Sequence, residues 1–229
     1  MTESKISEKI PPVVHMIWYG VDAPSPLHHV NEKYRSGYKS VVENSMCEIK
    51  LWSKSDCEYL IEQYPEYEGI YRAANNIMKY DIMRYLIVYH FGGTYLDADI
   101  VLKKSMENIM ANECFFIENI VPISRNNPGY YQPIRKGVLE HPVRIANYAF
   151  SSKPKNPIFL EILAEIRRRM HIQSIPKCDY DILYLTGPDV VTTVIHDIKK
   201  IIPVNIISKP VSNSIIEHTC AGEWRKKYY

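Results

Sequence analysis

One stretch decides the fold: Phe91-Gly92-Gly93-Thr94-Tyr95-Leu96-Asp97-Ala98-Asp99. Its glycines predict the end of a helix, since glycine readily adopts the positive φ that helix C-termini use. The residues from Thr94 to Leu102 then predict a buried strand interrupted by acids. In an extended backbone, side chains two positions apart leave the same face. We therefore expect Asp97 and Asp99 to hold one hard divalent cation together with phosphate oxygens.

The segment before the glycines predicts the clearest helix of the chain. Apolar residues recur there at helical spacing from Asn76 to His90. Asp81 and Arg84 lie three positions apart on this helix and so share one face. Two interpretations fit that spacing: a surface ion pair of little energetic value, or a pair that hydrogen-bonds sugar hydroxyls. The spacing alone does not separate them.

Alternation of strands and helices predicts an α/β fold with a mainly parallel central sheet. Strands are expected from Val13 to Gly20 and from Glu48 to Trp52, with a helix between them from Asn31 to Ser40. The region from Asn119 to Gly137 is rich in Asn, Pro, Gly and Tyr, and predicts an irregular excursion over the site. The other expected elements are helices over Cys57–Tyr64 (capped by Ser53 or Ser55), Pro157–Arg169 and Asp189–Lys199, a turn at Thr186-Gly187-Pro188, and a strand over Ile201–Ile207.

The composition is that of one ordinary globular domain, which we expect to span residues 1–229. Of the 229 residues, 46% are hydrophobic and 24% are charged, enough for one good-sized core. The net charge is +2 and no dense basic block is present, so we expect no nucleic-acid partner. No apolar run approaches the roughly 20 residues that span a bilayer, and the N-terminus lacks the apolar run of a secretory signal. We therefore expect a cytoplasmic protein without a transmembrane segment.

Several other residues have plain structural interpretations. Asp179-Tyr180-Asp181 repeats the acidic pattern, but no glycine turn or apolar strand precedes it, so we expect it to lie outside the site. Trp18 ends the first strand, where ligand crevices form in α/β folds, and it either packs in the core or stacks on a base. His15 is expected to be buried and hydrogen-bonded, whereas His28 and His29 are expected to be solvated.

A family resemblance extends this interpretation. The stretches Tyr80-Asp81-Ile82-Met83-Arg84-Tyr85 and Gly92 to Asp99 together resemble the hallmark of the DXD sugar-binding glycosyltransferases. That family includes initiating α-1,6-mannosyltransferases, capsular polysaccharide enzymes and, distantly, clostridial glucosylating toxins. The resemblance extends over nearly the whole chain through Ile10 to Trp18, Thr186-Gly187-Pro188, and His218 with Trp224. It implies a Rossmann-like GT-A fold, a retaining mechanism, and a nucleoside-diphosphate sugar held through Mn²⁺ or Mg²⁺.

The resemblance also implies roles for single residues. Asp97, Asp99 and Arg84 would form the catalytic set, with Asp99 ligating the metal and the neutral imidazole of His218 completing its site. The donor-binding residues would be Trp18 on the base, Asp81 and Arg84 on the sugar, Asp97 on the ribose or sugar, Trp224 on the diphosphate, and Gly93 and Asn147. UDP-sugars are favoured as donors, with GDP-mannose second.

We therefore expect an enzyme, a retaining glycosyltransferase that moves a hexose from a nucleotide sugar to a hydroxyl of a glycan, lipid or protein. The metal would stabilise the diphosphate as it leaves. Two other classes stay open. One is a metal-dependent phosphoryl-transfer enzyme, which usually needs more clustered acids than Asp97 and Asp99 provide. The other is a nucleotide-sugar-binding subunit without turnover.

Overall fold

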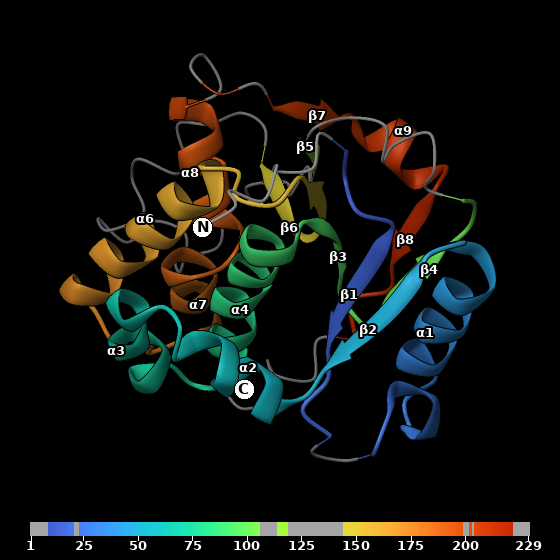
Figure 1. Ribbon diagram of the computed structural model, residues 1–229, viewed down its shortest axis with the longest axis horizontal. Helices are drawn as coiled ribbons and strands as arrows, with labels where there is room; N and C mark the ends of the chain where they lie inside the picture. The colour runs from blue at the N-terminus through green and yellow to red at the C-terminus, as the bar shows by residue number, and fades with distance from the viewer. Residues whose placement is uncertain are drawn as a thin grey trace, which may run out of the picture.

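A six-stranded sheet lies at the centre of the molecule (Figure 1). The structure is a computed structural model that describes residues 9–20, 23–105, 114–118, 144–198, 202 and 204–221. In the order of the sheet the strands are β2 (Glu48–Trp52), β1 (Val13–Ile17), β3 (Gly93–Leu96), β6 (Ile145–Ser152), β5 (Cys114–Glu118) and β7 (Asn205–Ile207). All run in one direction except β6, which is antiparallel to β3 and to β5. The expected α/β fold with a mainly parallel sheet is therefore confirmed.

A small second sheet corrects one expectation. Thr94 to Leu102 was expected to form a single strand, but β3 ends at Leu96 and a separate strand, β4, covers Ile100–Leu102. β4 leaves the central sheet and pairs antiparallel with β8 (Ile216–His218). A turn divides β3 from β4, because the Ile100 amide donates to the Asp97 carbonyl at 3.1 Å. The acidic residues therefore lie in a turn and not in extended backbone.

All of the helices that the sequence predicts are present. They are α1 (Glu32–Asn44), α2 (Lys54–Ile61), α4 (Asn76–Phe91), α6 (Ile158–Ile172) and α8 (Pro188–Ile198). Ser53 caps α2 through a capping box with Asp56. The structure also contains elements that were not predicted: the helical segments η1 (Pro26–His28), α3 (Pro65–Ala73), α7 (Asp179–Leu185) and α9 (Lys209–Asn213), and the strands β5, β6 and β8. The excursion expected over Asn119 to Gly137 lies outside the described residues.

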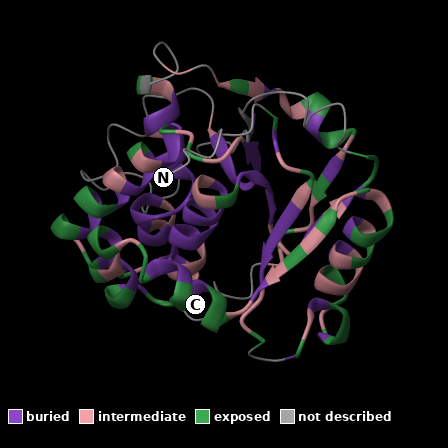
Figure 2. Cartoon of the chain, in the orientation of Figure 1, coloured by how far each residue is buried: buried purple, intermediate pink, exposed green. Residues whose placement is uncertain are grey.

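The helices cover the two faces of the sheet unequally. Figure 1 shows α2, α3, α4, α6, α7 and α8 on one side and α1 with β4 and β8 on the other. Each side has its own apolar core, and α4 is buried along most of its length (Figure 2). Within the part of the chain that the structure describes, we found no helix with the length and apolar character needed to cross a membrane.

Strand β1 lies between these two cores and is buried on both faces. Val14 and Met16 pack in the core on the side of α1, whereas Ile17 belongs to the core under α4. A strand buried on both faces reads as a nearly continuous apolar run, which explains why its sequence is so readily recognised. β1 pairs in parallel with β2 and β3, so its end lies beside the end of β3, where the acidic turn begins.

The glycine turn between α4 and β3 depends on both of its glycines. Gly92 has φ +68° and Gly93 has φ +88°, a region that side chains with a Cβ rarely adopt. A Cβ on Gly93 would also lie 2.7 Å from the Val13 carbonyl oxygen. Gly93 is therefore required for the close approach of β3 to β1, and its donor-binding role stays a prediction.

The expected buried state of His15 is confirmed, and it carries a consequence for stability. Trp52 donates its indole N–H to His15 Nδ1 at 3.1 Å, so Nε2 carries the proton and donates to the Gly92 carbonyl at 3.0 Å. The side chain is 2% exposed. Burial is the main cause that lowers the pKa of His15 to about 4, since it disfavours the charged imidazolium.

We expect this histidine to make the protein less stable in mild acid. Between about pH 6.5 and 4 the unfolded chain takes up a proton on His15 that the folded chain does not, so stability falls as the pH falls through that window. The pKa difference corresponds to about 3 kcal/mol in the free energy of unfolding. Urea unfolding at pH 7 and pH 5 should show a smaller pH-dependent loss in His15→Gln than in the parent. Equal losses in the two proteins would contradict the assignment.

Candidate active site

The acidic turn after β3 brings two carboxylates together. Its start is fixed by the Asp97 amide, which donates to the Tyr148 carbonyl on β6 at 2.9 Å. Helix α1 lies directly against the turn: a Cβ added to Gly37 would come 2.5 Å from the Ala98 carbonyl oxygen. Asp97 and Asp99 therefore come together through a turn that contacts with β6 and α1 hold in place. The extended-strand geometry expected from the sequence is wrong, although the expected convergence is correct.

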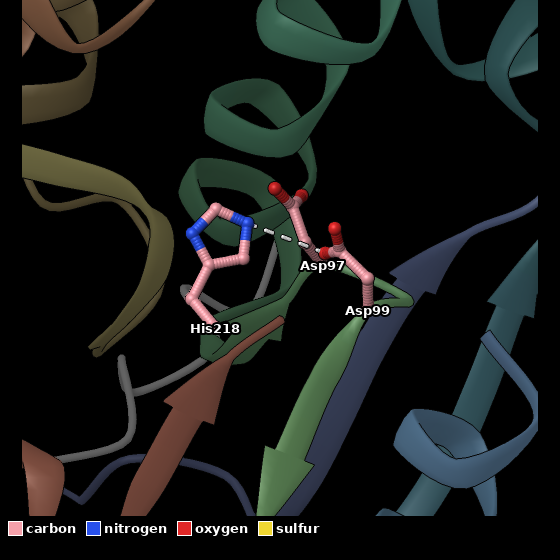
Figure 3. Close-up of side chains that lie close together, drawn as sticks. All are labelled: Asp97, Asp99 and His218. Atoms are coloured by element: carbon pink, nitrogen blue, oxygen red, sulfur yellow. Dashed lines mark ion pairs between the residues drawn. The ribbon is translucent and has the colours of Figure 1, made fainter. Parts of the chain in front are cut away.

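His218 joins the two carboxylates from the far end of the chain. The pairing of β4 with β8 places His218 opposite Ile100, one residue after the acidic turn. Figure 3 shows the three side chains facing one another, and a ligand atom of each lies within 4.8 Å of the others. His218 Nε2 is 3.4 Å from Asp99 Oδ1. A residue separated by more than a hundred positions in sequence thus becomes part of the acidic group.

The charges in this group are coupled. Burial works against the charged imidazolium of His218, but hydrogen bonds to Asp99 and Cys220 and the charges of Asp99 and Asp97 outweigh it and raise its pKa to about 10. Burial raises the pKa of Asp97 above its ordinary value, opposed by Arg84. For Asp99, burial is outweighed by its contacts with His218 and Ala221, so its pKa is lowered. Asp99 and His218 therefore form an ion pair at neutral pH.

The side chains of Asp97, Asp99 and His218 are suitable ligands for a divalent cation. Carboxylate oxygens are ligands for Mg²⁺ and Mn²⁺, and a neutral imidazole nitrogen is a common ligand for metal ions. Asp97, Asp99 and His218 offer one ligand atom each and leave coordination positions for the oxygens of a diphosphate. A bound cation would replace the proton of His218, as metal binding to histidine generally does.

Arg84 connects the acidic turn to helix α4. Its guanidinium lies 3.1 Å from Asp81 Oδ1 and 3.2 Å from Asp97 Oδ1, and it donates to the Asn147 carbonyl at 2.6 Å. Arg84 is 6% exposed and Asp81 is 4% exposed. The surface ion pair that the spacing also allowed is therefore wrong. Instead, the pair is buried between α4 and β6, next to the acidic turn.

Asp81 is the centre of a wider network. Asn147 Nδ2 donates to its Oδ1 at 2.9 Å, and the Thr186 hydroxyl donates to its Oδ2 at 2.7 Å. Burial raises the pKa of Asp81 to about 6, against the opposing effect of Arg84. The structure thus assembles Asp81, Arg84, Asp97 and Asn147, four of the predicted site residues, from α4, β6 and the acidic turn.

Comparison with known proteins finds a family that resembles the part of the chain that contains the acidic turn. Residues 27–116 match the family described as "Glycosyltransferase sugar-binding region containing DXD motif". This stretch of the chain is similar to a glycosyltransferase sugar-binding region. The DXD motif of that region is Asp97-Ala98-Asp99 in the acidic turn described above.

Two relatives from Schizosaccharomyces pombe (strain 972 / ATCC 24843) extend the similarity. The chain is 30% identical over 121 residues to "Inositol phosphoceramide mannosyltransferase 1", covering 52% of this chain and 37% of the relative. It is 27% identical over 179 residues to "Inositol phosphoceramide mannosyltransferase 3", covering 73% of this chain and 48% of the relative. The chain thus spans less than half the length of these relatives.

A solved structure supports the fold of the sugar-binding region and its surroundings. The chain resembles "PaToxG Glycosyltransferase" with a TM-score of 0.55 and 15% sequence identity, over 83% of this chain and 70% of that one. At this identity the likeness concerns the fold, and it agrees with the expected GT-A architecture.

Trp18 lies at the end of β1 and is only partly buried. Its indole N–H donates to the Ala23 carbonyl at 2.8 Å, and its ring meets His29 and Tyr34 edge-on at 5.5 Å and 5.4 Å between centroids. Trp18 is thus held in place by these contacts, and stacking on a base stays a prediction. The solvated state expected for His29 is wrong, because His29 packs against this tryptophan and is 4% exposed. Trp224 lies outside the described residues.

The second acidic copy does not resemble the DXD motif of the sugar-binding region. Asp179 and Asp181 are buried in the first turn of α7, and Asp181 Oδ2 accepts from the Lys177 amide at 2.7 Å. Acidic residues in a first helical turn are stabilised by the helix dipole and by free amides. This is a structural arrangement, as the lack of a preceding strand and glycine turn suggested.

Three groups around the DXD motif were not predicted. Tyr95 donates its hydroxyl to Asp97 Oδ1 at 2.8 Å, and Tyr148 packs its ring 4.2 Å from that of His218. The Ala221 amide donates to Asp99 Oδ2 at 2.8 Å. The sequence offers a signal for Tyr95 alone, since it precedes Asp97 by two positions on a strand.

Proposed function

We propose that this chain is the catalytic domain of a retaining, metal-assisted glycosyltransferase that moves a hexose from a nucleoside-diphosphate sugar to a hydroxyl acceptor. The observation that carries the proposal is the grouping of Asp97, Asp99 and His218 within a recognised sugar-binding region. The names of the relatives favour mannose as the hexose. GDP-mannose is therefore the first donor to test, ahead of the UDP-sugars that the sequence resemblance favoured.

The protein residues would have distinct tasks in this reaction. Asp99 and His218, with Asp97 beside them, would hold Mn²⁺ or Mg²⁺. The bound metal would supply charge stabilisation for the departing diphosphate. Arg84 holds Asp81 and Asp97 at fixed positions, because its guanidinium contacts both carboxylates. Asp81 and Asn147 would then form further hydrogen bonds with the donor sugar.

We propose a front-side displacement for the transfer itself. The acceptor oxygen forms its bond to the anomeric carbon on the face from which the diphosphate leaves. The carbon–oxygen bond to the diphosphate breaks, its electron pair stays with the diphosphate, and the acceptor proton passes to a departing phosphate oxygen. Asp81 is a poor candidate for a covalent nucleophile, because both of its oxygens accept hydrogen bonds and it is also paired with Arg84. This favours direct displacement over a covalent intermediate.

The names of the relatives also suggest an acceptor class. Both are named for inositol phosphoceramide. We propose that the acceptor hydroxyl belongs to an inositol-bearing headgroup, among the glycan, lipid and protein acceptors that the sequence left open.

A donor-hydrolysis assay tests the proposal. The purified chain with Mn²⁺ should release the nucleoside diphosphate and free hexose from one donor in a panel of GDP-mannose and UDP-hexoses. Proton NMR of the first sugar formed should show the anomer of the donor, as retention requires. Inorganic phosphate without free hexose would instead support a phosphoryl-transfer enzyme. Saturable donor binding without any turnover, with or without an inositol-bearing acceptor, would support a binding subunit.

A further inference from the structure

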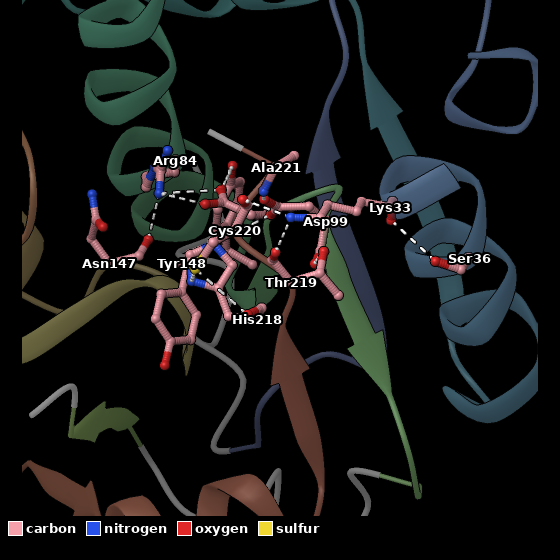
Figure 4. A network of polar contacts seen from close by, with 12 residues as sticks. Lys33, Ser36, Arg84, Asp99, Asn147, Tyr148, His218, Thr219, Cys220 and Ala221 are labelled. Atoms are coloured by element: carbon pink, nitrogen blue, oxygen red, sulfur yellow. Dashed lines mark hydrogen bonds and ion pairs between the residues drawn. The ribbon is translucent and has the colours of Figure 1, made fainter. Parts of the chain in front are cut away.

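The short segment that follows β8, Thr219–Ala221, lies against the acidic turn, and we refer to it as the strap. Thr219 donates to the Asp99 carbonyl from its amide at 3.1 Å and from its hydroxyl at 2.8 Å. The Ala221 amide donates to the Asp99 carboxylate at 2.8 Å. Figure 4 shows the strap beside Asp99, with the Lys33 side chain extending toward it from helix α1. Both the backbone and the side chain of Asp99 are therefore held by the strap.

The strap is held from its other side by Lys33. The ammonium of Lys33, in the first turn of α1, donates to the Thr219 carbonyl at 2.6 Å and to the Cys220 carbonyl at 3.1 Å. These are charge-assisted hydrogen bonds, which are stronger than bonds between neutral groups. The backbone of Lys33 is itself held in place, because the Asn31 side chain caps α1 by accepting from the Lys33 amide at 3.0 Å.

The backbone of the strap needs such a support. Cys220 has φ +50°, which is uncommon for a residue with a Cβ; such a conformation costs on the order of 1–3 kcal/mol and persists only where neighbouring contacts hold it. Asp99 contacts the strap on one side and Lys33 contacts it on the other, and the Cys220 thiol lies 3.6 Å from the His218 carbonyl oxygen. Losing the Lys33 contacts removes one of these supports, and the strap directly follows His218.

We infer that Lys33 is a positioning residue for the cation site formed by Asp97, Asp99 and His218. This inference rests on the proposed function. Lys33 contacts none of the three ligand side chains in the bonds described above; it acts through the strap, which fixes Asp99 and follows His218 directly. Partners that orient metal ligands typically change metal affinity by about 10–100-fold when they are removed. We expect an effect near the lower end, about tenfold, because Lys33 is exposed to solvent.

A Mn²⁺ titration followed by electron paramagnetic resonance tests this directly, without turnover. Lys33→Met should raise the dissociation constant for Mn²⁺ about tenfold, and Lys33→Arg, which keeps the charge and donors, should restore most of the affinity. In the activity assay, Lys33→Met should raise the Mn²⁺ concentration for half-maximal rate more than it lowers the rate at saturating Mn²⁺. Circular dichroism should show both variants folded.

Two matched controls distinguish a positioning role of Lys33 from a general loosening of the fold on loss of a lysine. Lys39→Met removes a lysine from the same helix that pairs only loosely with Glu43, at 3.8 Å. Lys103→Met removes the contact with Glu217 on β8, at 3.0 Å, next to His218 but outside the strap. Both should bind Mn²⁺ like the parent.

The outcomes distinguish failure of the inference from failure of the proposed function. A parent protein that binds no Mn²⁺ and turns over no donor would overturn the proposed function. If the parent binds Mn²⁺ and Lys33→Met binds it equally well, Lys33 has no positioning role. If Lys33→Met weakens GDP binding in the presence of EDTA as much as it weakens Mn²⁺ binding, Lys33 contacts the nucleotide directly and the inference is wrong.

Discussion

Asp99→Asn is expected to abolish metal-dependent donor hydrolysis while the protein stays folded. The change removes one anionic ligand from the cation site, but the new amide oxygen can still accept from Ala221. We expect the rate at saturating donor to fall at least about 100-fold, which corresponds to about 3 kcal/mol of transition-state stabilisation. Release of nucleoside diphosphate should be measured across a Mn²⁺ series, with Mn²⁺ binding followed in parallel.

Asp197→Asn is the matched control for this variant. Asp197 is an exposed carboxylate on α8, so its loss should leave both Mn²⁺ affinity and turnover at the parent level. Asp181 is a less suitable control, because it is buried and accepts a backbone hydrogen bond. Parent-level, Mn²⁺-dependent turnover in Asp99→Asn would show that the acidic turn does not hold the metal.

The parts of the fold that the sequence predicts are those with strong local patterns. β1 is apolar except for His15, and α4 has apolar residues at helical spacing between an Asn75 cap and the Gly92 turn. β6 was missed because Ile145–Ser152 is buried at every position and contains small and polar residues, so it shows no alternation. α3 was missed although Pro65 at its first position and acidic residues in its first turn are start signals.

The candidate site was also predicted only in part, because only some of its residues form a local pattern in the sequence. The Asp97 and Asp99 pair and the Asp81 and Arg84 pair are close in sequence, and a resemblance added Asn147 and His218. The contacts that place them are distant in sequence: Thr186 reaches Asp81, and β8 pairs with β4. No local pattern encodes such pairings. In the predicted turn at Thr186-Gly187-Pro188, the amides of Thr186 and Gly187 both donate to the Ile182 carbonyl.

Arg84→Met should cause the largest loss of stability at this site. The guanidinium is buried between Asp81 and Asp97, and its removal leaves two carboxylates without their cationic partner. Breaking a buried ion pair from one side typically lowers the free energy of unfolding by about 3–5 kcal/mol. Urea unfolding should show this loss, and donor hydrolysis should fall with it. Arg72→Met provides a contrast, since Arg72 pairs with Glu68 on the surface of α3 and its loss should change stability little.

A second substitution tests whether the loss comes from the uncompensated charges. In the double variant Asp81→Asn with Arg84→Met, one orphaned carboxylate becomes a neutral amide that can still bond with Asn147 and Thr186. The double variant should therefore be more stable than Arg84→Met alone, with a coupling energy within the range of about 0.5–3 kcal/mol seen for residues in one network. Strictly additive losses would instead mean that Arg84 stabilises the fold through packing of its side chain and not through its charge. In that case Asp81 and Asp97 would have to be held by their other partners, Asn147, Thr186 and Tyr95, and the role of Arg84 in fixing the acidic turn would be wrong.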